Sequence, residues 1–170
     1  MNIESSIFRE YDIRGTYPEQ INESSIKSIA FAIAKRCKKD NISTLVVGRD
    51  GRISGPALLE AFCEGLIESG INVDNIGLVT SPLLYFAAKK STSKSGIMIT
   101  GSHNPKNYNG IKMVINDSPI SGTEIYTLIS HAKNTNLEKG EVKYSDIKPI
   151  YLEEVCKNIS INNPEKIKVV

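Results

Sequence analysis

The stretch Thr44-Leu45-Val46-Val47-Gly48 decides the fold class. It is a short, continuous apolar run that is rich in β-branched side chains and shows no alternation of polar and apolar residues. Such a run predicts a strand whose two faces are both covered, as in the sheets of α/β proteins. Further strands are expected over residues 72–77, 95–100 and 111–115, which are also apolar and end at polar turns.

Helices are expected between these strands, because apolar side chains recur there at helical spacing. Four of the five expected helices have a recognisable start: Asn22 as an N-cap, Pro56 and Pro82 in first turns, and a capping box formed by Ser121 and Glu124. In chain order, the helices are expected over residues 22–39, over 54–70, after Pro82, after Ser121 and over 146–160.

The last two strands are separated by only about ten residues, which is too short for a helical crossover. They are therefore expected to run antiparallel. Together these elements predict an α/β fold, a three-layer α/β/α domain with a four-stranded mixed sheet that is mostly parallel and has one antiparallel strand.

Composition excludes several classes of protein. The chain has 170 residues, a net charge of +2 and 40% hydrophobic residues, which is typical of a globular domain and gives no indication of a nucleic-acid or membrane-surface partner. No apolar run approaches the ~20 residues that span a bilayer, and the first residues do not form a secretory signal. The three cysteines are far apart, which favours reduced thiols and a cytoplasmic location.

The loop Thr100-Gly-Ser-His-Asn-Pro-Lys-Asn-Tyr-Asn-Gly110 carries the residues most suited to chemistry. It leaves the carboxyl end of a buried strand, where α/β sheets place their ligand sites. Ser102 is the candidate nucleophile and His103 the candidate acid or base, with the serine carrying a phosphoryl group. Two other readings stay open: a turn in which Ser102 caps backbone groups, and a serine hydrolase, for which no third triad member is visible.

Two cations are candidates for holding phosphate oxygens near this loop. They are Arg14 and Lys112, and either of them is also compatible with an ordinary surface charge. The polar turn of residues 48–52 is expected to be structural, with Asp50 in the turn and Arg49 paired locally. His131 stands alone on an expected helix and is predicted to face solvent or to be partly packed.

Three motifs of the chain are recognisable: Phe8-Arg-Glu-Tyr-Asp-Ile-Arg-Gly15, Val47-Gly-Arg-Asp-Gly-Arg-Ile-Ser-Gly-Pro56 and Thr100-Gly-Ser-His-Asn-Pro-Lys-Asn-Tyr-Asn-Gly-Ile-Lys112. Together they resemble the α-D-phosphohexomutase superfamily, and most of all its bacterial phosphomannomutase/phosphoglucomutase branch. The Ser-His-Asn-Pro loop is highly specific to this family. The chain departs from the usual pattern at Lys106-Asn107 and Ile111, where Pro-Asp and Phe are common.

The resemblance implies an enzyme that moves phosphate between O1 and O6 of mannose or glucose phosphates through a hexose 1,6-bisphosphate, which also serves as activator. It implies that Ser102 is the phosphorylated serine and a ligand of Mg²⁺, and that His103 is the acid or base. Arg14 and Tyr11 would lie near the substrate and the phosphoryl group, and Lys112 beside them.

The resemblance also implies a four-domain parent enzyme in which residues 1–160 are domain 1, the phosphoserine domain. Residues 161–170 would be a linker and the first strand of a truncated domain 2. The missing part of domain 2 would hold the aspartate ligands of Mg²⁺, domain 3 the sugar-selecting loop and domain 4 the distal phosphate site. The chain alone is then expected to be inactive. The alternative is a stand-alone, non-catalytic domain that binds phosphate or phosphosugar, with residues 167–170 as a true edge strand.

Overall fold

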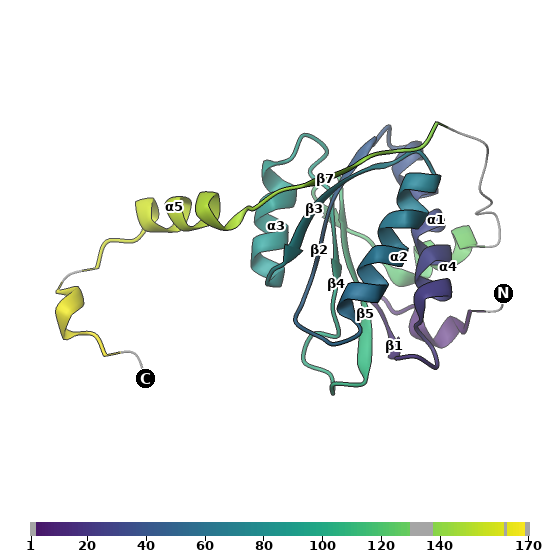
Figure 1. Cartoon of the computed structure of the whole chain (residues 1–170), viewed down its shortest axis with the longest axis horizontal. Helices are drawn as coiled ribbons and strands as arrows, with labels where there is room; N and C mark the ends of the chain where they lie inside the picture. The colour runs from purple at the N-terminus through teal and green to yellow at the C-terminus, as the bar shows by residue number, and fades with distance from the viewer. Residues whose placement is uncertain (1–2, 130–137, 162, 169–170) are drawn as a thin grey trace.

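The computed structural model describes residues 3–129, 138–161 and 163–168. It shows three layers, with a central sheet between helices on both faces (Figure 1). The three-layer α/β/α architecture predicted from the sequence is therefore confirmed. His131 and Val170 lie outside the described residues.

The sheet is larger than predicted and has seven strands in the described residues. Six of them lie in the order β1-β5-β4-β2-β3-β7, and β6 pairs with β5. The neighbours among β4, β2, β3 and β7 are parallel, while β5 is antiparallel to both β4 and β1. The strands are β1 (Ile13–Thr16), β2 (Thr44–Arg49), β3 (Asn72–Leu78), β4 (Gly96–Ile99), β5 (Tyr108–Ile115), β6 (Ser118–Pro119) and β7 (Val142–Tyr144).

The prediction of four strands was wrong because three strands have no apolar run of their own. β1, β6 and β7 are four, two and three residues long, and each exists by pairing with a longer neighbour. The four strands that were predicted are present as β2, β3, β4 and β5, and the antiparallel pairing of β4 with β5 is confirmed.

The helices divide between the two faces of the sheet. Helices α1, α2 and α4 lie together on one face and α3 covers the other (Figure 1). Short 3₁₀ turns occur at Ser5–Ile7 and Pro164–Lys166. The helices are α1 (Glu23–Lys39), α2 (Gly55–Glu68), α3 (Ser81–Lys90), α4 (Gly122–Ile129) and α5 (Lys148–Asn158).

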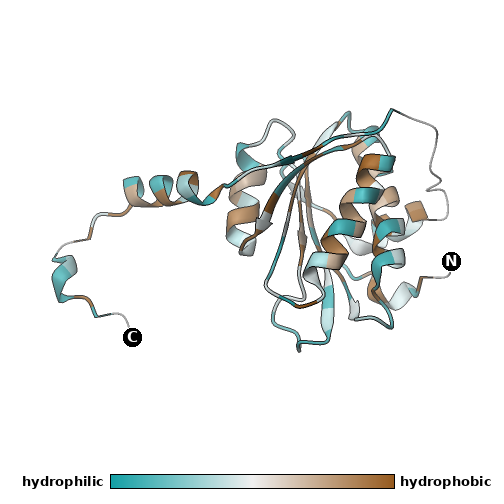
Figure 2. Ribbon diagram, in the orientation of Figure 1, coloured by the Kyte–Doolittle hydropathy of each residue, from teal (hydrophilic) through white to brown (hydrophobic). Residues whose placement is uncertain are grey.

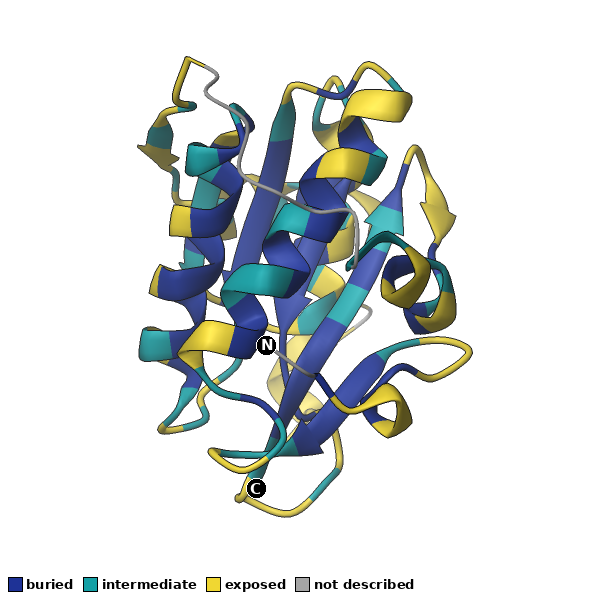
Figure 3. Ribbon diagram, turned by 90° about the vertical axis from the view of Figure 1, so that its right-hand side faces the viewer, coloured by how far each residue is buried: buried dark blue, intermediate teal, exposed yellow. Residues whose placement is uncertain are grey.

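The buried apolar side chains form one cluster on each face of the sheet. The larger cluster fills the space under α1, α2 and α4, with Ile13, Val47 and Phe62 among its members. The smaller lies under α3 and includes Val46, Leu84 and Met98, with the remaining members Ile76, Val79 and Ala87. Apolar colour concentrates on the strands and the inner helix faces in Figure 2, and these surfaces are the buried ones in Figure 3.

Helix α5 and the residues after it extend away from the three layers (Figure 1). None of its described residues is buried, and it contacts the domain through Tyr151, whose ring meets Phe86 of α3 edge to face at 5.2 Å. The strand expected over residues 167–170 is not formed at Ile167 and Lys168, and the other two residues are not described.

A search of the described residues for a helix both long and apolar enough to cross a lipid bilayer finds none.

Candidate active site

The candidate site lies where β2 and β4 end, at the lower edge of the sheet in Figure 1. Two connections meet there: residues 50–54 between β2 and α2, and residues 100–107 between β4 and β5. The side chains of Asp50, Arg52 and Ser54 of the first connection all hydrogen-bond to the second connection or to the start of β5. The first connection therefore supports the second.

Ser102 is exposed and has a left-handed backbone, with φ at +56°. Its N–H donates to the Thr100 hydroxyl at 2.8 Å, and that hydroxyl donates to Asp50 Oδ2 at 2.7 Å. Thr100 is buried between its two partners, of which Asp50 is partly exposed and Ser102 is exposed. A non-glycine residue seldom adopts this conformation, and where it does the surrounding contacts hold it there. The serine hydroxyl is thus presented from a fixed backbone.

Arg52 makes the densest set of contacts in the site. Its Nε donates to Asp50 Oδ2 at 3.2 Å. Its two terminal nitrogens donate to four backbone carbonyls of the loop, those of Ser102 (2.9 Å), Asn104 (2.7 Å), Pro105 (2.6 Å) and Tyr108 (2.8 Å). The guanidinium therefore lies inside the curve of the loop and joins its two arms.

Gly101 leaves the space that the guanidinium of Arg52 occupies. A β-carbon built on Gly101 would lie 2.6 Å from Arg52 Nη1, which is too close for any real contact. The backbone of Gly101 therefore approaches Arg52 closely because glycine has no β-carbon. The left-handed backbone conformation in this loop is adopted by Ser102 and not by either of its glycines.

Arg14 approaches the same loop from β1. Its Nη1 donates to Asn104 Oδ1 at 2.7 Å and its Nη2 pairs with the carboxylate of Asp12. The side chain is only 6% exposed, and its Nε is buried without a hydrogen-bond partner. Asn104 is thereby held through its side chain by Arg14 and through its carbonyl by Arg52.

The other predicted residues surround the loop less closely. His103 follows Ser102 directly and is exposed, and within the described residues its imidazole makes no hydrogen bond. Lys112 is half-buried on β5, opposite Met98 of β4, so its side chain lies on the α3 face of the sheet. Tyr11 is 74% exposed and lies just before β1. Arg14 is joined directly to the Ser102 loop, whereas no hydrogen bond of the described chain joins Tyr11 or Lys112 to it.

A hollow of about 460 Å³ opens beside Ser102 on the α3 face. Its wall combines apolar side chains, including Met98 and Leu83, with the hydroxyls of Thr80 and Ser81 at the start of α3. Lys148, at the start of α5, also lines it. The polar groups that line this mainly apolar hollow are the hydroxyls, the cation of Lys148 and the carboxylate of Asp50.

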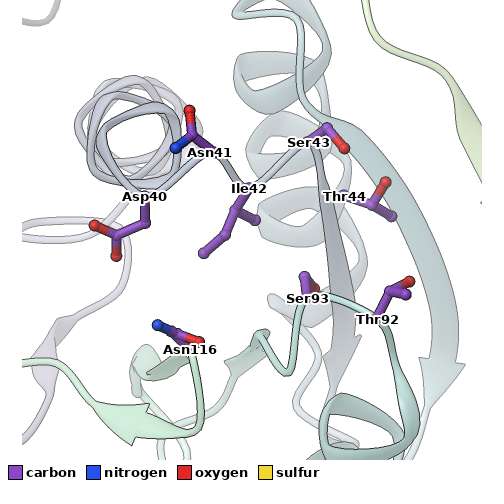
Figure 4. A pocket seen from close by; sticks show the side chains of 8 residues that line it. All are labelled: Asp40, Asn41, Ile42, Ser43, Thr44, Thr92, Ser93 and Asn116. Carbon is purple, nitrogen blue, oxygen red and sulfur yellow. The ribbon is translucent and has the colours of Figure 1, made fainter.

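A polar hollow of about 270 Å³ lies at the opposite end of the sheet, where β2 and β4 begin. Polar side chains surround Ile42 there, including those of Asn41, Ser93 and Asn116 (Figure 4). Its one carboxylate, that of Asp40, is paired with Arg36. Because β2 and β4 start at this end, it is a strand's length away from Ser102 and takes no part in the candidate site.

The residues near Ser102 do not complete a Mg²⁺ site. Among the described residues, no three His, Cys, Asp or Glu side chains lie close enough together to hold a metal ion. Both oxygens of Asp50, the carboxylate tied to this loop, accept hydrogen bonds from Arg52 or Thr100. A phosphate on Ser102 would supply one of the several oxygens that Mg²⁺ requires.

The sequence model of the phosphoglucomutase/phosphomannomutase α/β/α domain I matches residues 5–138. The chain belongs to the phosphoglucomutase/phosphomannomutase family. The match covers the Ser102 loop, the turn that carries Arg52 and the β1 strand that carries Arg14.

Relatives in this family extend well beyond the length of the chain. A phosphoglucomutase of Neisseria meningitidis serogroup B is 38% identical over 99% of the chain and 37% of its own length. A phosphomannomutase/phosphoglucomutase of Pseudomonas syringae pv. tomato is 40% identical over 97% of the chain and 36% of its own length. The crystal structure of a phosphoglucomutase/phosphomannomutase family protein from Burkholderia thailandensis superimposes with a TM-score of 0.90, at 33% identity, over 95% of the chain and 38% of that protein. The chain therefore spans little more than a third of the relatives it matches.

Within this family domain, the residue that sequence reasoning missed is Arg52. The turn of residues 48–52 was interpreted as structural, and within it Arg49 does bond locally, to the Asp50 carbonyl at 3.0 Å. The contacts of Arg52 with a loop about fifty residues away were not foreseen, because its partners are backbone carbonyls and every residue type has one.

Proposed function

We propose that this chain is the phosphoserine domain of a hexose-phosphate mutase and that Ser102 Oγ carries the phosphoryl group. The observation that supports this most directly is the exposed Ser102 hydroxyl, presented from a left-handed backbone at the end of β4 in a chain of the phosphoglucomutase/phosphomannomutase family. A residue that accepts and returns a phosphoryl group needs an accessible oxygen on a rigid support.

In the proposed reaction, phospho-Ser102 gives its phosphoryl group to the free O6 hydroxyl of a hexose 1-phosphate. The bond from phosphorus to Ser102 Oγ breaks and a bond to O6 forms, giving the 1,6-bisphosphate. The bisphosphate turns around, and its O1 phosphoryl group returns to Ser102 Oγ, leaving the 6-phosphate. The exposed imidazole of His103 takes the proton from the attacking hydroxyl and returns it to the leaving oxygen.

Cations near the loop would stabilise the charge of the phosphoryl group during transfer. Arg14 is attached to the loop through Asn104, and Lys112 faces the same side of the sheet as the hollow beside Ser102. Tyr11, which is largely exposed just before β1, is proposed to contact the sugar. The preference between mannose and glucose phosphates would be set by parts of the enzyme outside this chain.

The ligands that complete the Mg²⁺ site would also come from domains outside this chain. The relatives are nearly three times as long, so the mutase proposed here requires the further domains that they carry. Those domains would supply the aspartates that complete a Mg²⁺ site with the Ser102 phosphate. Hexose 1,6-bisphosphate would activate the enzyme by phosphorylating Ser102, and the cytoplasm, where hexose phosphates occur, is its proposed location.

The test is a coupled assay that converts glucose 1-phosphate in the presence of glucose 1,6-bisphosphate and Mg²⁺. The polypeptide extended by the domains of the relatives should turn over, and Ser102→Ala should lose nearly all activity, while the 170-residue chain alone should be inactive. Ser118→Ala, which removes an exposed serine at the far end of β5, is the matched control and should keep full activity.

Mass spectrometry of the extended protein should locate one phosphoryl group on the peptide that contains Ser102. Normal turnover by Ser102→Ala would overturn the choice of nucleophile. Binding of hexose phosphate without turnover in the extended protein would favour a non-catalytic phosphosugar-binding domain.

A further inference from the structure

The guanidinium of Arg52 is fully committed to holding the Ser102 loop. An arginine side chain has five N–H donors, and the structure provides five acceptors for them. Asp50 takes the Nε donor, and the carbonyls of Ser102, Asn104, Pro105 and Tyr108 take the other four. The side chain is only 12% exposed. It therefore has no donor left for a phosphate or a sugar.

The loop needs such a cation to adopt this shape. Three of the four carbonyls belong to residues 100–107, which form no helix or strand, and the fourth belongs to Tyr108 at the start of β5. Of the four, the Pro105 carbonyl also accepts the Tyr108 N–H, so Arg52 joins an existing turn there. Four carbonyl oxygens point into one small space, where their dipoles repel one another unless a positive donor lies between them. Hydrogen bonds from a charged donor are about twice as strong as neutral ones, so a single guanidinium holds all four.

Ser102 is anchored on both sides of its α-carbon by this arrangement. Its N–H is held by the Thr100 hydroxyl, and its carbonyl is held by Arg52. Asp50 joins the two anchors, because it accepts from both Thr100 and Arg52. These bonds fix the left-handed backbone from which the serine hydroxyl projects.

We propose that Arg52 is a positioning residue: it sets the orientation of Ser102 by filling the loop from within and does not touch the substrate. This proposal rests on the assignment of Ser102 as the phosphoryl carrier. Lysine is a poor replacement, because its three donors on a single nitrogen cannot reach acceptors spread around a planar fork. The loop should therefore depend on the shape of the arginine and not only on its charge.

The first experiment measures amide hydrogen exchange by NMR in the 170-residue chain and its Arg52→Lys variant. The Ser102, Asn104 and Tyr108 amides, which are hydrogen-bonded within the loop, should exchange about tenfold faster or more in the variant. The amides of β2 and α1 should stay within about twofold. Arg36→Lys is the matched control, since Arg36 also bonds through a forked guanidinium but lies at the other end of the domain.

Gly101→Ala is the second variant. It keeps Arg52 but places a β-carbon where the guanidinium lies, so it should speed exchange of the same three amides. Unchanged loop exchange in both variants would overturn the proposal. An equal increase in amide exchange rate across the whole domain would also overturn the proposal, because Arg52 would then stabilise the domain in general and not this loop.

The second experiment measures kinetics in the extended enzyme. A misplaced nucleophile should lower kcat of Arg52→Lys by about a hundredfold and leave KM for the hexose phosphate within about threefold, because Arg52 has no donor for substrate. A raised KM with unchanged kcat would contradict a positioning role. If Ser102→Ala kept its activity, the proposed function would fail, and the exchange experiment would still decide whether Arg52 orders the loop.

Discussion

At the scale of single residues, the Thr100 hydroxyl connects the two halves of the site. This hydroxyl is buried, and it donates to the partly exposed Asp50 and accepts from the Ser102 N–H. Thr100→Val keeps the shape and leaves both partners without their bond, which should lower the free energy of unfolding by about 2 kcal/mol. Urea unfolding measures this. The control Thr92→Val, at an exposed hydroxyl, should change the free energy of unfolding by less than about 0.5 kcal/mol. Equal losses in Thr100→Val and Thr92→Val would contradict the role of Thr100.

Replacement of His103 should affect the reaction rate without affecting the stability of the fold. Its imidazole is exposed and makes no hydrogen bond within the described chain, so His103→Ala should leave the urea midpoint unchanged. In the extended enzyme, the loss of an acid or base should lower kcat by about 10²–10⁴-fold. Steady-state kinetics at several pH values measures this. Unaltered kcat would assign proton transfer to another group.

The sequence pointed to candidate site residues whose side chains are suited to chemistry. It did not point to residues whose role depends on contact with the backbone of a distant loop. Ser102, His103 and Arg14 were selected because hydroxyl, imidazole and guanidinium groups are informative in themselves. Arg52 and Gly101 depend on each other through space and lie about fifty residues apart. Such a pair becomes visible only when the fold brings the two connections together.

At the scale of elements, helices and long strands were predicted well because each is specified by its own residues. Helix α1 begins at the predicted N-cap: Asn22 accepts from the Ser25 N–H at 3.0 Å, and the Ser25 hydroxyl accepts from the Asn22 N–H at 2.9 Å. The box predicted at Ser121 is half formed. Ser121 accepts from the Glu124 N–H, while the Glu124 carboxylate bonds to Arg36 of α1 at 2.5 Å. The short strands depend on neighbours, so no local pattern predicts them.

The N-cap of α1 should contribute measurably to stability. Asn22→Ala removes the acceptor for the Ser25 N–H, and the free energy of unfolding should fall by about 1 kcal/mol. Asn22→Asp keeps an acceptor and should lose much less. Urea unfolding of both variants provides the comparison, and equal losses would show that the cap is not the cause.

At the scale of the whole molecule, two thiols lie inside the larger apolar cluster. Cys37 is on α1 and Cys63 on α2, and both are buried, whereas Cys156 on α5 is exposed. Burial raises the pKa of Cys37 and of Cys63 from 9.0 to about 12. The reactive thiolate is therefore suppressed at both positions while the domain is folded.

These thiols should make stability fall at high pH. Below about pH 9 both thiols are protonated in the folded domain and in the unfolded chain. Above about pH 9 the thiols of the unfolded chain lose their protons, while those of the folded domain keep them. Each thiol should then lower the free energy of unfolding by about 1.4 kcal/mol per pH unit until the pH approaches 12. Urea unfolding between about pH 8 and pH 11 should show a shallower decline in the Cys37→Ala, Cys63→Ala double variant than in the unaltered chain. Cys156→Ala is the control, and identical slopes in all three would refute the explanation.

The left-handed backbone of Ser102 restricts which amino acids evolution can place there. Threonine also has a hydroxyl, but its β-branch is strongly disfavoured at positive φ. Glycine and asparagine accept the backbone readily and have no hydroxyl. A library of all substitutions at this position, selected for mutase activity in the extended enzyme, should therefore return serine. If Ser102 carries the phosphoryl group as proposed, its replacement by a phosphorylated threonine would first require a different backbone conformation of the loop.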